Sequence, residues 1–167
     1  MRYAQIRKMD ISNGEGVGVS LFVQGCHFHC PGCHNPEQWS FSGGKEYTIN
    51  TESRILELIE PEYITRFSIL GGEPLEKCNW LDLAALITAI KSKKPSIKIW
   101  LYTGYELDNL ASNNNPLLQT ILLNVDYIVD GQFVQEEKDI TLQFRGSGNQ
   151  NIYHRSFDSF IKDENFK

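Results

Sequence analysis

The sequence lacks a long hydrophobic run. Its apolar segments are short, and none approaches the roughly 20 residues that a helix needs to span a bilayer. Residues 1–10 are polar and have no apolar stretch of the kind found in a secretory signal peptide. These absences argue against a membrane-spanning helix and a cleaved leader, so we expect a cytoplasmic protein.

Clustered positive charge is also missing. Lys and Arg number 16 against 21 Asp and Glu, which gives a net charge of −5, and no basic block occurs. Nucleic-acid binding depends on neighbouring Lys and Arg that contact phosphates, so the composition argues against a nucleic-acid partner. Internal repeats and low-complexity segments are absent from the sequence as well. Its length of 167 residues predicts a single domain, 1–167, that is long enough to bury a real core.

Cysteine is scarce, but three of the four cysteines are concentrated in one loop. Cys26, Cys30 and Cys33 lie within eight residues, with the spacing C-x3-C-x2-C. Three soft thiolates on one short loop can converge on a single metal centre. They are one fewer than the four protein ligands that complete a structural zinc site or an ordinary iron–sulfur site. This deficit indicates an iron left open for a ligand that is not protein.

Two simpler interpretations of the loop remain open. His27, His29 or His34 could supply a fourth ligand to zinc, or two of the cysteines could form a disulfide. The disulfide is the weaker interpretation, because thiols stay reduced in the cytoplasm. The fourth cysteine, Cys78, precedes an amphipathic segment and is more typical of a small buried or incidental residue than of a ligand.

Short apolar segments alternate with helical patterns along the chain. Strands are predicted at 17–23, 66–70, 97–102 and 125–129, with a further strand or entry segment at 2–9. Helices are predicted at 51–59, between an N-cap at Asn79 and a stop at Pro95, at 106–110 and at 116–123. The alternation is typical of βαβ units, so we expect an α/β fold with a mostly parallel sheet and flanking helices. Because a complete eightfold barrel needs about 250 residues, the sheet should be open or a partial (βα) barrel.

Four glycine-containing segments each follow a predicted strand directly: 25–35, 71–72, 103–104 and 130–131. Ligands of parallel α/β sheets bind beyond the carboxyl ends of the strands, so we expect these segments at one edge. Taken alone, Gly71-Gly72-Glu73-Pro74 predicts a tight turn with a helix-starting proline. Beside a metal loop, its glycines would let backbone carbonyls approach an ammonium group, and Glu73 would add opposite charge.

The loop 25–35 resembles the cluster motif of radical S-adenosylmethionine enzymes. The resemblance implies that Cys26, Cys30 and Cys33 hold three irons of a 4Fe–4S cluster, and that S-adenosylmethionine chelates the fourth iron. It also implies that His34 packs on the cluster or on its ligand. The fold that it implies is an open or partial barrel of the radical S-adenosylmethionine type.

The turn 71–74 resembles the motif of the same enzymes that binds the amino group of the methionine moiety. The resemblance implies an S-adenosylmethionine site formed by two short segments: Gly32, Cys33 and His34 from the loop, and Gly71, Gly72 and Glu73 from the turn. Glu73 stands where some relatives have Asp, which keeps the carboxylate.

Six segments extend the resemblance over nearly the whole chain, in the order 13–16, 25–35, 71–74, 102–105, 126–133 and 145–150. Together they resemble the family of anaerobic ribonucleoside-triphosphate reductase-activating proteins, which are small glycyl-radical activases. Segments 129–133 and 145–150 narrow the resemblance to this family. Gly148 departs from it, because many relatives have a second serine there.

The family resemblance implies a definite reaction. A one-electron donor such as flavodoxin reduces the cluster, and the resulting 5′-deoxyadenosyl radical removes a hydrogen atom from a glycine of the reductase large subunit. No side chain is expected to act as a general acid or base, because the cofactor breaks the bonds. Two alternatives are an activase of the pyruvate formate-lyase type and a non-catalytic zinc-binding interaction domain.

Overall fold

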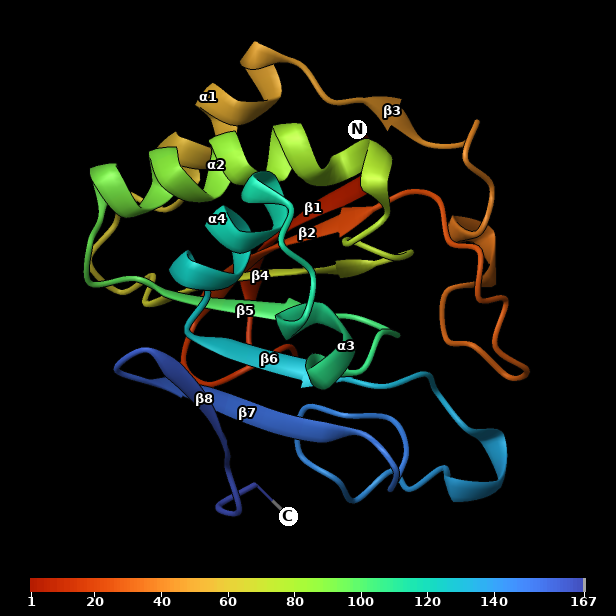
Figure 1. Cartoon of the computed structure of the whole chain (residues 1–167). Coiled ribbons are helices and arrows are strands. Elements are labelled where there is room, and N and C mark those ends of the chain that lie inside the picture. Colours follow the sequence, from red (N-terminus) through yellow and green to blue (C-terminus); the bar gives the residue numbers. More distant parts are fainter. Residues whose placement is uncertain (167) are drawn as a thin grey trace.

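A single eight-stranded sheet forms the centre of the protein (Figure 1). The computed structural model describes residues 1–166. The strand order is β3-β1-β2-β4-β5-β6-β7-β8. The strands are β1 (Arg2–Asp10), β2 (Gly18–Val23), β3 (Lys45–Glu46), β4 (Arg66–Gly71), β5 (Lys98–Tyr102), β6 (Tyr127–Asp130), β7 (Asn151–Ser156) and β8 (Ser159–Lys162). The helices are α1 (Ile49–Leu58), α2 (Trp80–Lys93), α3 (Leu107–Ala111) and α4 (Pro116–Asn124).

The sheet is mixed, so the predicted mostly parallel sheet with flanking helices, in an open or partial (βα) barrel, is wrong. Strands β2, β4, β5 and β6 pair in parallel. The outer strands, β1 with β3 on one side and β7 with β8 on the other, pair antiparallel. The helices pack on one face only, while loops cover the opposite face (Figure 1). In the described part of the chain, the architecture is an open mixed sheet with one helical layer.

The individual elements follow the sequence pattern more closely than their assembly does. The strands predicted at 17–23, 66–70, 97–102 and 125–129 are confirmed as β2, β4, β5 and β6, and all predicted helices are present. The segment 2–9, expected to be a strand or an entry segment, forms β1. Asn79 precedes α2, but its side chain does not cap the helix. Its amide instead donates to the carbonyl oxygens of Glu73, at 3.2 Å, and Pro74, at 3.3 Å. Asn79 therefore anchors the glycine turn to the start of α2.

Among residues 1–166, no helix is long and apolar enough to cross a membrane.

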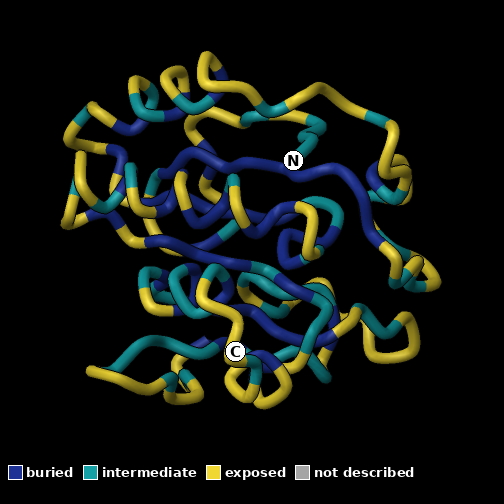
Figure 2. Tube along the Cα trace, turned by 45° about the horizontal axis from the view of Figure 1, so that its top comes forward, coloured by how far each residue is buried: buried dark blue, intermediate teal, exposed yellow. Residues whose placement is uncertain are grey.

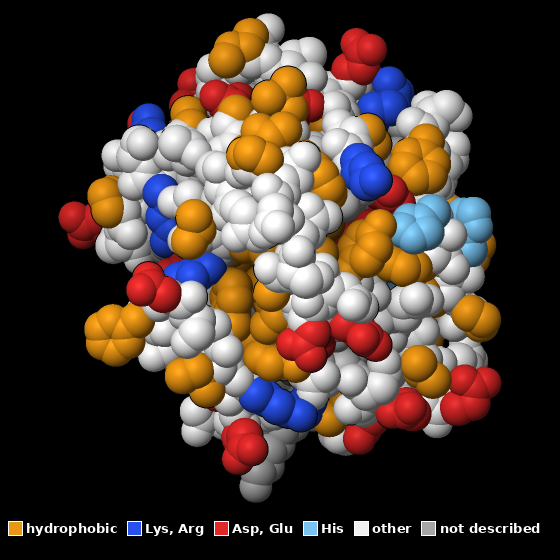
Figure 3. Space-filling view, viewed as in Figure 1, with side chains coloured by type: hydrophobic (Ala, Val, Ile, Leu, Met, Phe, Trp, Pro, Cys, Tyr) orange, Lys and Arg blue, Asp and Glu red, His pale blue; other side chains and the backbone are white. Residues whose placement is uncertain are grey.

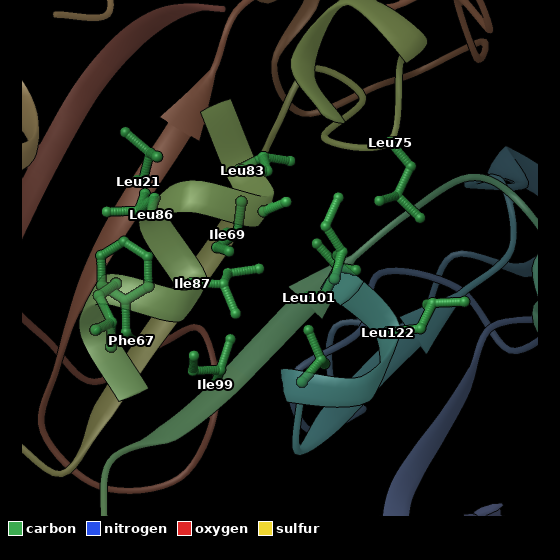
Figure 4. Packing of buried hydrophobic residues seen from close by; sticks show 14 of the residues in the cluster. Leu21, Phe67, Ile69, Leu75, Leu83, Leu86, Ile87, Ile99, Leu101 and Leu122 are labelled. Atoms are coloured by element: carbon green, nitrogen blue, oxygen red, sulfur yellow. The ribbon is translucent and has the colours of Figure 1, made fainter. Parts of the chain in front are cut away.

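Alternation along the parallel strands separates a helical face from a loop face. Phe67 and Ile69 of β4 are fully buried and pack against Ile87 of α2 (Figure 4). Burying each such side chain contributes roughly 1.5–3 kcal/mol to stability. The alternate residues Ser68 and Leu70 point to the other face, as the pleat of a strand requires. The central strands are consequently buried along most of their trace (Figure 2).

A buried arginine fixes the N-terminal loop against the loop face. Arg66, at the start of β4, is 0% exposed and donates to the backbone oxygens of Asp10 and Asn13 and to the hydroxyl of Ser68. Its guanidinium group also lies 3.7 Å from the carboxylate of Asp10. Burial lowers the pKa of Arg66, but the charge of Asp10 opposes this effect. The pair therefore holds segment 10–14, two of whose residues reach the site described below.

Candidate functional site

A cavity of about 460 Å³ lies at the carboxyl ends of the parallel strands. Its wall brings together most of the predicted site residues: Cys26, Cys30, Cys33, His34, Gly71, Gly72 and Glu73. Gly32 belongs to the same loop but lies against Gln135 on its exposed side. In Figure 3, histidine side chains gather at the end of the molecule toward which these strands point. The structure thus places the cysteine loop and the glycine turn around one space.

The three loop cysteines are free thiols on the wall of this cavity. Cys26 is buried, whereas Cys30 and Cys33 are half-buried. Cys78 is exposed and precedes α2, and its thiol contacts the side-chain oxygen of Asn79 at 3.7 Å. Its position outside the cavity separates Cys78 from the other three thiols.

Backbone N–H groups of the loop point at two of these sulfurs. Burial raises the pKa of the Cys26 thiol to about 11, while the N–H groups of Phe28 and His29 work in the opposite direction. The backbone N–H of Asn35 donates to the sulfur of Cys33 at 3.4 Å. Such donors stabilise a thiolate, and the positive charge of bound iron would offset the cost of burying one.

Cys30 is contacted by a different part of the chain. Its thiol lies 3.8 Å from the side-chain oxygen of Gln132, which is 102 residues further along. Burial raises the pKa of Cys30, and the backbone N–H of Phe133 opposes this rise. The segment that follows β6 therefore completes the surroundings of the third sulfur.

The two ends of the cysteine loop are held close together. The N–H of Gly25 donates to the carbonyl oxygen of Gln38 at 2.8 Å, and the N–H of Cys26 donates to that of Trp39 at 3.1 Å. Between these anchors, the N–H of Cys33 donates to the carbonyl oxygen of Cys30 at 3.1 Å. These backbone bonds fix the two ends of the loop relative to each other.

Glu73 is only 1% exposed and links three parts of the site. Its carboxylate accepts hydrogen bonds from the N–H of Leu75 at 2.7 Å, the hydroxyl of Thr103 at 2.8 Å and the N–H of Gly104 at 2.7 Å. Its own N–H donates to the carbonyl oxygen of Gly25 at 2.8 Å. Burial raises the pKa of Glu73 to about 7, although these donors oppose the rise. Glu73 therefore connects the ends of β4 and β5 to the cysteine loop.

His34 packs against residues of the segments 129–133 and 145–150. Its ring centroid lies 5.0 Å from that of Phe133. A Cβ placed on Gly146 would lie 3.0 Å from the Phe133 ring and 3.2 Å from the His34 ring, so a side chain there would push on both. The 145–150 loop thus reaches the cysteine loop through His34.

Several wall residues come from outside the motifs and were missed in the sequence: Arg7, Phe22, Leu70, Leu142 and Phe144. For two of these residues, the sequence contained a pattern that could have placed them at the site. Phe22 and Leu70 are paired in the parallel register of β2 and β4, so strand alternation could have placed them on one face. The others depend on how the loops fold over the sheet, which no local pattern specifies.

The donor set fits an iron–sulfur cluster. Three soft sulfur ligands share one cavity, and one of them, Cys33, accepts a hydrogen bond from the backbone N–H of Asn35. Cysteine thiolates are the ligands that iron–sulfur clusters use.

Comparison with known proteins agrees with this donor set. Residues 12–153 match the family model of a 4Fe-4S single cluster domain. The chain is 40% identical over 157 residues to the anaerobic ribonucleoside-triphosphate reductase-activating protein of Escherichia coli (strain K12), which covers 92% of this chain and 99% of the relative. The chain belongs to this family. The protein of that name from Salmonella typhi is 40% identical over 156 residues, with the same coverage, and that from Enterobacteria phage T4 is 33% identical over 155 residues, covering 92% of this chain and 94% of the relative.

Membership of the reductase-activating family confirms the resemblance found in the sequence and identifies an iron–sulfur domain. It also decides against the two alternatives, the pyruvate formate-lyase type of activase and the zinc-binding interaction domain. The match covers the cysteine loop, the glycine turn and the 145–150 loop.

Proposed function

We propose that this protein is a radical S-adenosylmethionine enzyme that generates a glycyl radical on the large subunit of anaerobic ribonucleoside-triphosphate reductase. The observation that supports the proposal most directly is the convergence of three free thiols and a glycine turn on one cavity, in a member of the reductase-activating family. Residues 1–167 would form a single domain for this reaction, and the expected location is the cytoplasm.

In this proposal, Cys26, Cys30 and Cys33 would hold three irons of the cluster, and the fourth iron would have no protein ligand. When bound, a 4Fe–4S cluster with S-adenosylmethionine supplies one-electron cleavage of the sulfonium, which yields methionine and a 5′-deoxyadenosyl radical. The hydrogen atom that this radical takes from a glycine of the reductase becomes part of 5′-deoxyadenosine, and the glycine keeps the unpaired electron. The electron comes from a one-electron donor such as flavodoxin.

The residues around the cavity bind and orient the cofactors. The S-adenosylmethionine contacts are assigned to two segments: Gly32, Cys33 and His34 of the loop, and Gly71, Gly72 and Glu73 of the turn. Phe22, Leu70 and Phe144 line the wall on the loop face, where they exclude water. The chemistry requires these tasks of the protein and no proton transfer by a side chain.

A protein substrate needs space beside the site. A second cavity of about 680 Å³ lies between α3 and the segment after β6, and shares Phe28, Gly104, Gly131 and Gln132 with the first. The shared wall makes the two cavities neighbours. This arrangement supports access by a polypeptide segment of the reductase.

An anaerobic assay tests the proposal. The protein is reconstituted with iron and sulfide, reduced, and mixed with S-adenosylmethionine, with and without the reductase. The expected results are a paramagnetic 4Fe–4S signal that changes with S-adenosylmethionine, formation of 5′-deoxyadenosine, and a glycyl radical signal only when the reductase is present. A colourless protein with bound zinc and no cleavage would refute the proposal.

A further inference from the structure

The segment 131–134, which follows β6, lies against the cysteine loop at two points. Near Cys30 it places the side-chain amide of Gln132, at 3.8 Å from the sulfur, and the backbone N–H of Phe133. Beside these, the Phe133 ring packs on His34. The backbone N–H of Cys30 itself also lies beside its sulfur, but in contrast to Cys26 and Cys33 this sulfur is contacted by a distant segment as well.

The 145–150 loop holds the backbone of segment 131–134 in place. Three of its side chains bond to backbone groups of that segment: Gln150 donates to the oxygen of Gly131 at 2.9 Å, Asn149 donates to the oxygen of Gln132 at 2.8 Å, and Ser147 accepts from the N–H of Val134 at 3.2 Å. The loop is itself closed, because the Gln150 side chain accepts from the N–H of Gly146 at 2.8 Å. These bonds hold the backbone on either side of Phe133 and so fix the position of Gln132 relative to Cys30.

We propose that segment 131–134, positioned by the 145–150 loop, presents the side-chain amide of Gln132 to the Cys30 sulfur as a hydrogen-bond donor and thereby raises the reduction potential of the cluster. The inference rests on the proposed function, in which Cys30 is an iron ligand. As a free thiol, Cys30 donates to the Gln132 oxygen; as an iron-bound thiolate it carries no proton. The amide of Gln132 then presents its NH₂ group, since a primary amide has a donor and an acceptor on the same carbon.

Hydrogen bonds to a ligating sulfur withdraw negative charge from it. They stabilise the reduced cluster, which carries one more electron, and so raise its potential. Gln132 is exposed, so its side chain can be changed without opening the core. Gln132, Ser147, Asn149 and Gln150 are positioning residues in this account, since they act on the cluster through Cys30.

The test is a redox titration of the reconstituted full-length protein, followed by paramagnetic resonance under anaerobic conditions. Gln132→Ala removes one donor, and we expect the equilibrium constant for one-electron reduction to fall about tenfold, which is about 59 mV in midpoint potential. Gln132→Glu adds negative charge and should lower the potential further. Asn149→Ala should shift it in the same direction. Gln143 is an exposed residue between the two segments, so Gln143→Ala is the matched control and should leave the midpoint potential unchanged.

Iron and sulfide contents are measured in every variant. A Gln132→Ala variant with a full cluster and the wild-type potential would overturn the inference, and so would one that loses its cluster, since that would mark Gln132 as structural. If Asn149→Ala does not fold, the potentials of the two Gln132 variants are sufficient to test the inference. A wild-type protein that holds no 4Fe–4S cluster, or a Cys30→Ala variant that keeps an intact one, would instead refute the proposed function.

Discussion

The hydroxyl of Thr103 donates a hydrogen bond of 2.8 Å to the buried carboxylate of Glu73. Together with the N–H of Gly104, at 2.7 Å, it joins the carboxyl end of β5 to the turn that follows β4. The backbone of Glu73 also holds Gly25, at the start of the cysteine loop. Glu73 thus joins β5 to the glycine turn through its side chain and the cysteine loop to the same turn through its backbone.

Glu73 should make stability depend on pH. Burial raises its pKa from 4.5 to about 7, so folding favours the protonated carboxyl. The stabilisation from this group is fully present below the unfolded pKa of 4.5 and is lost as the pH rises through about 7. The loss amounts to about 3 kcal/mol in the free energy of unfolding.

Urea unfolding of wild type and Glu73→Gln between about pH 4 and pH 8 tests this prediction. Glutamine does not titrate, so the stability of the wild type should fall relative to that of the variant as the pH rises. Parallel pH profiles for the two proteins would contradict the prediction.

Each cysteine of the loop should be required for the cluster. Cys26→Ala, Cys30→Ala and Cys33→Ala each remove one of only three protein ligands, so we expect loss of the 4Fe–4S absorbance and of reductase activation. Cys78→Ser is the matched control, since Cys78 is exposed and outside the cavity. Iron analysis and the glycyl radical signal provide the measurements. Loss of the cluster in Cys78→Ser would sink the ligand assignment.

Gly72→Ala should disturb the contact between the glycine turn and the cysteine loop. A Cβ at this position would lie 2.4 Å from the carbonyl oxygen of Gly25 and 2.9 Å from its carbon, and both are backbone atoms that cannot rotate away. We expect a loss of roughly 1–3 kcal/mol in the free energy of unfolding, with reduced cluster content.

Gly148→Ala is the control for this substitution, because its Cβ would meet its nearest neighbour, an oxygen of Glu137, at an ordinary 3.5 Å. Urea unfolding and iron analysis of both variants decide the matter. Equal stability of the Gly72→Ala and Gly148→Ala proteins would count against the proposed close approach.

Arg66→Met should be strongly destabilising. It leaves the carboxylate of Asp10, whose side chain is 1% exposed, without its buried partner, which costs about 3–5 kcal/mol in comparable cases. It also releases the loop whose residues Ser12 and Asn13 line the cavity. The measurement is urea unfolding, with Arg54→Ala on the exposed side of α1 as the control. A change in stability no larger than that of the control would contradict the structural role of the pair.

The sequence predicted the central strands and indicated a strand or entry segment at 2–9, which is β1, but it did not predict β3, β7 or β8. β2 is buried at every position and β4 at every position except Gly71, whereas β7 has a single buried residue, Ile152, and shows no alternation. The hairpin between β7 and β8 pairs Ser156 with Ser159 and turns at Phe157, whose φ is +54°. The turn lacks the Asn-Gly or Asp-Gly sequence that usually marks a hairpin. The antiparallel edges, and with them the mixed sheet, were therefore hidden.

The motifs located the candidate site, but only the structure showed how its distant parts meet. The spacing of the cysteines and the turn at Gly71 were visible in the sequence, because those residues are consecutive. The 145–150 loop could be recognised in the sequence as a motif, but its structural role could not, since its partners Gly131 and Gln132 lie on another segment. Contacts of this kind depend on tertiary packing, and no local propensity encodes them.

The surroundings of Cys30 have a consequence for biosynthesis. A growing chain presents all three cysteines long before the ribosome has made Gln132, which contacts Cys30 across 102 residues, or the 145–150 loop that holds it. An iron centre assembled on such an unfinished chain would have one side open to water and oxygen. Iron delivery is therefore expected to wait until the 145–150 loop has been synthesised and has folded against Gln132.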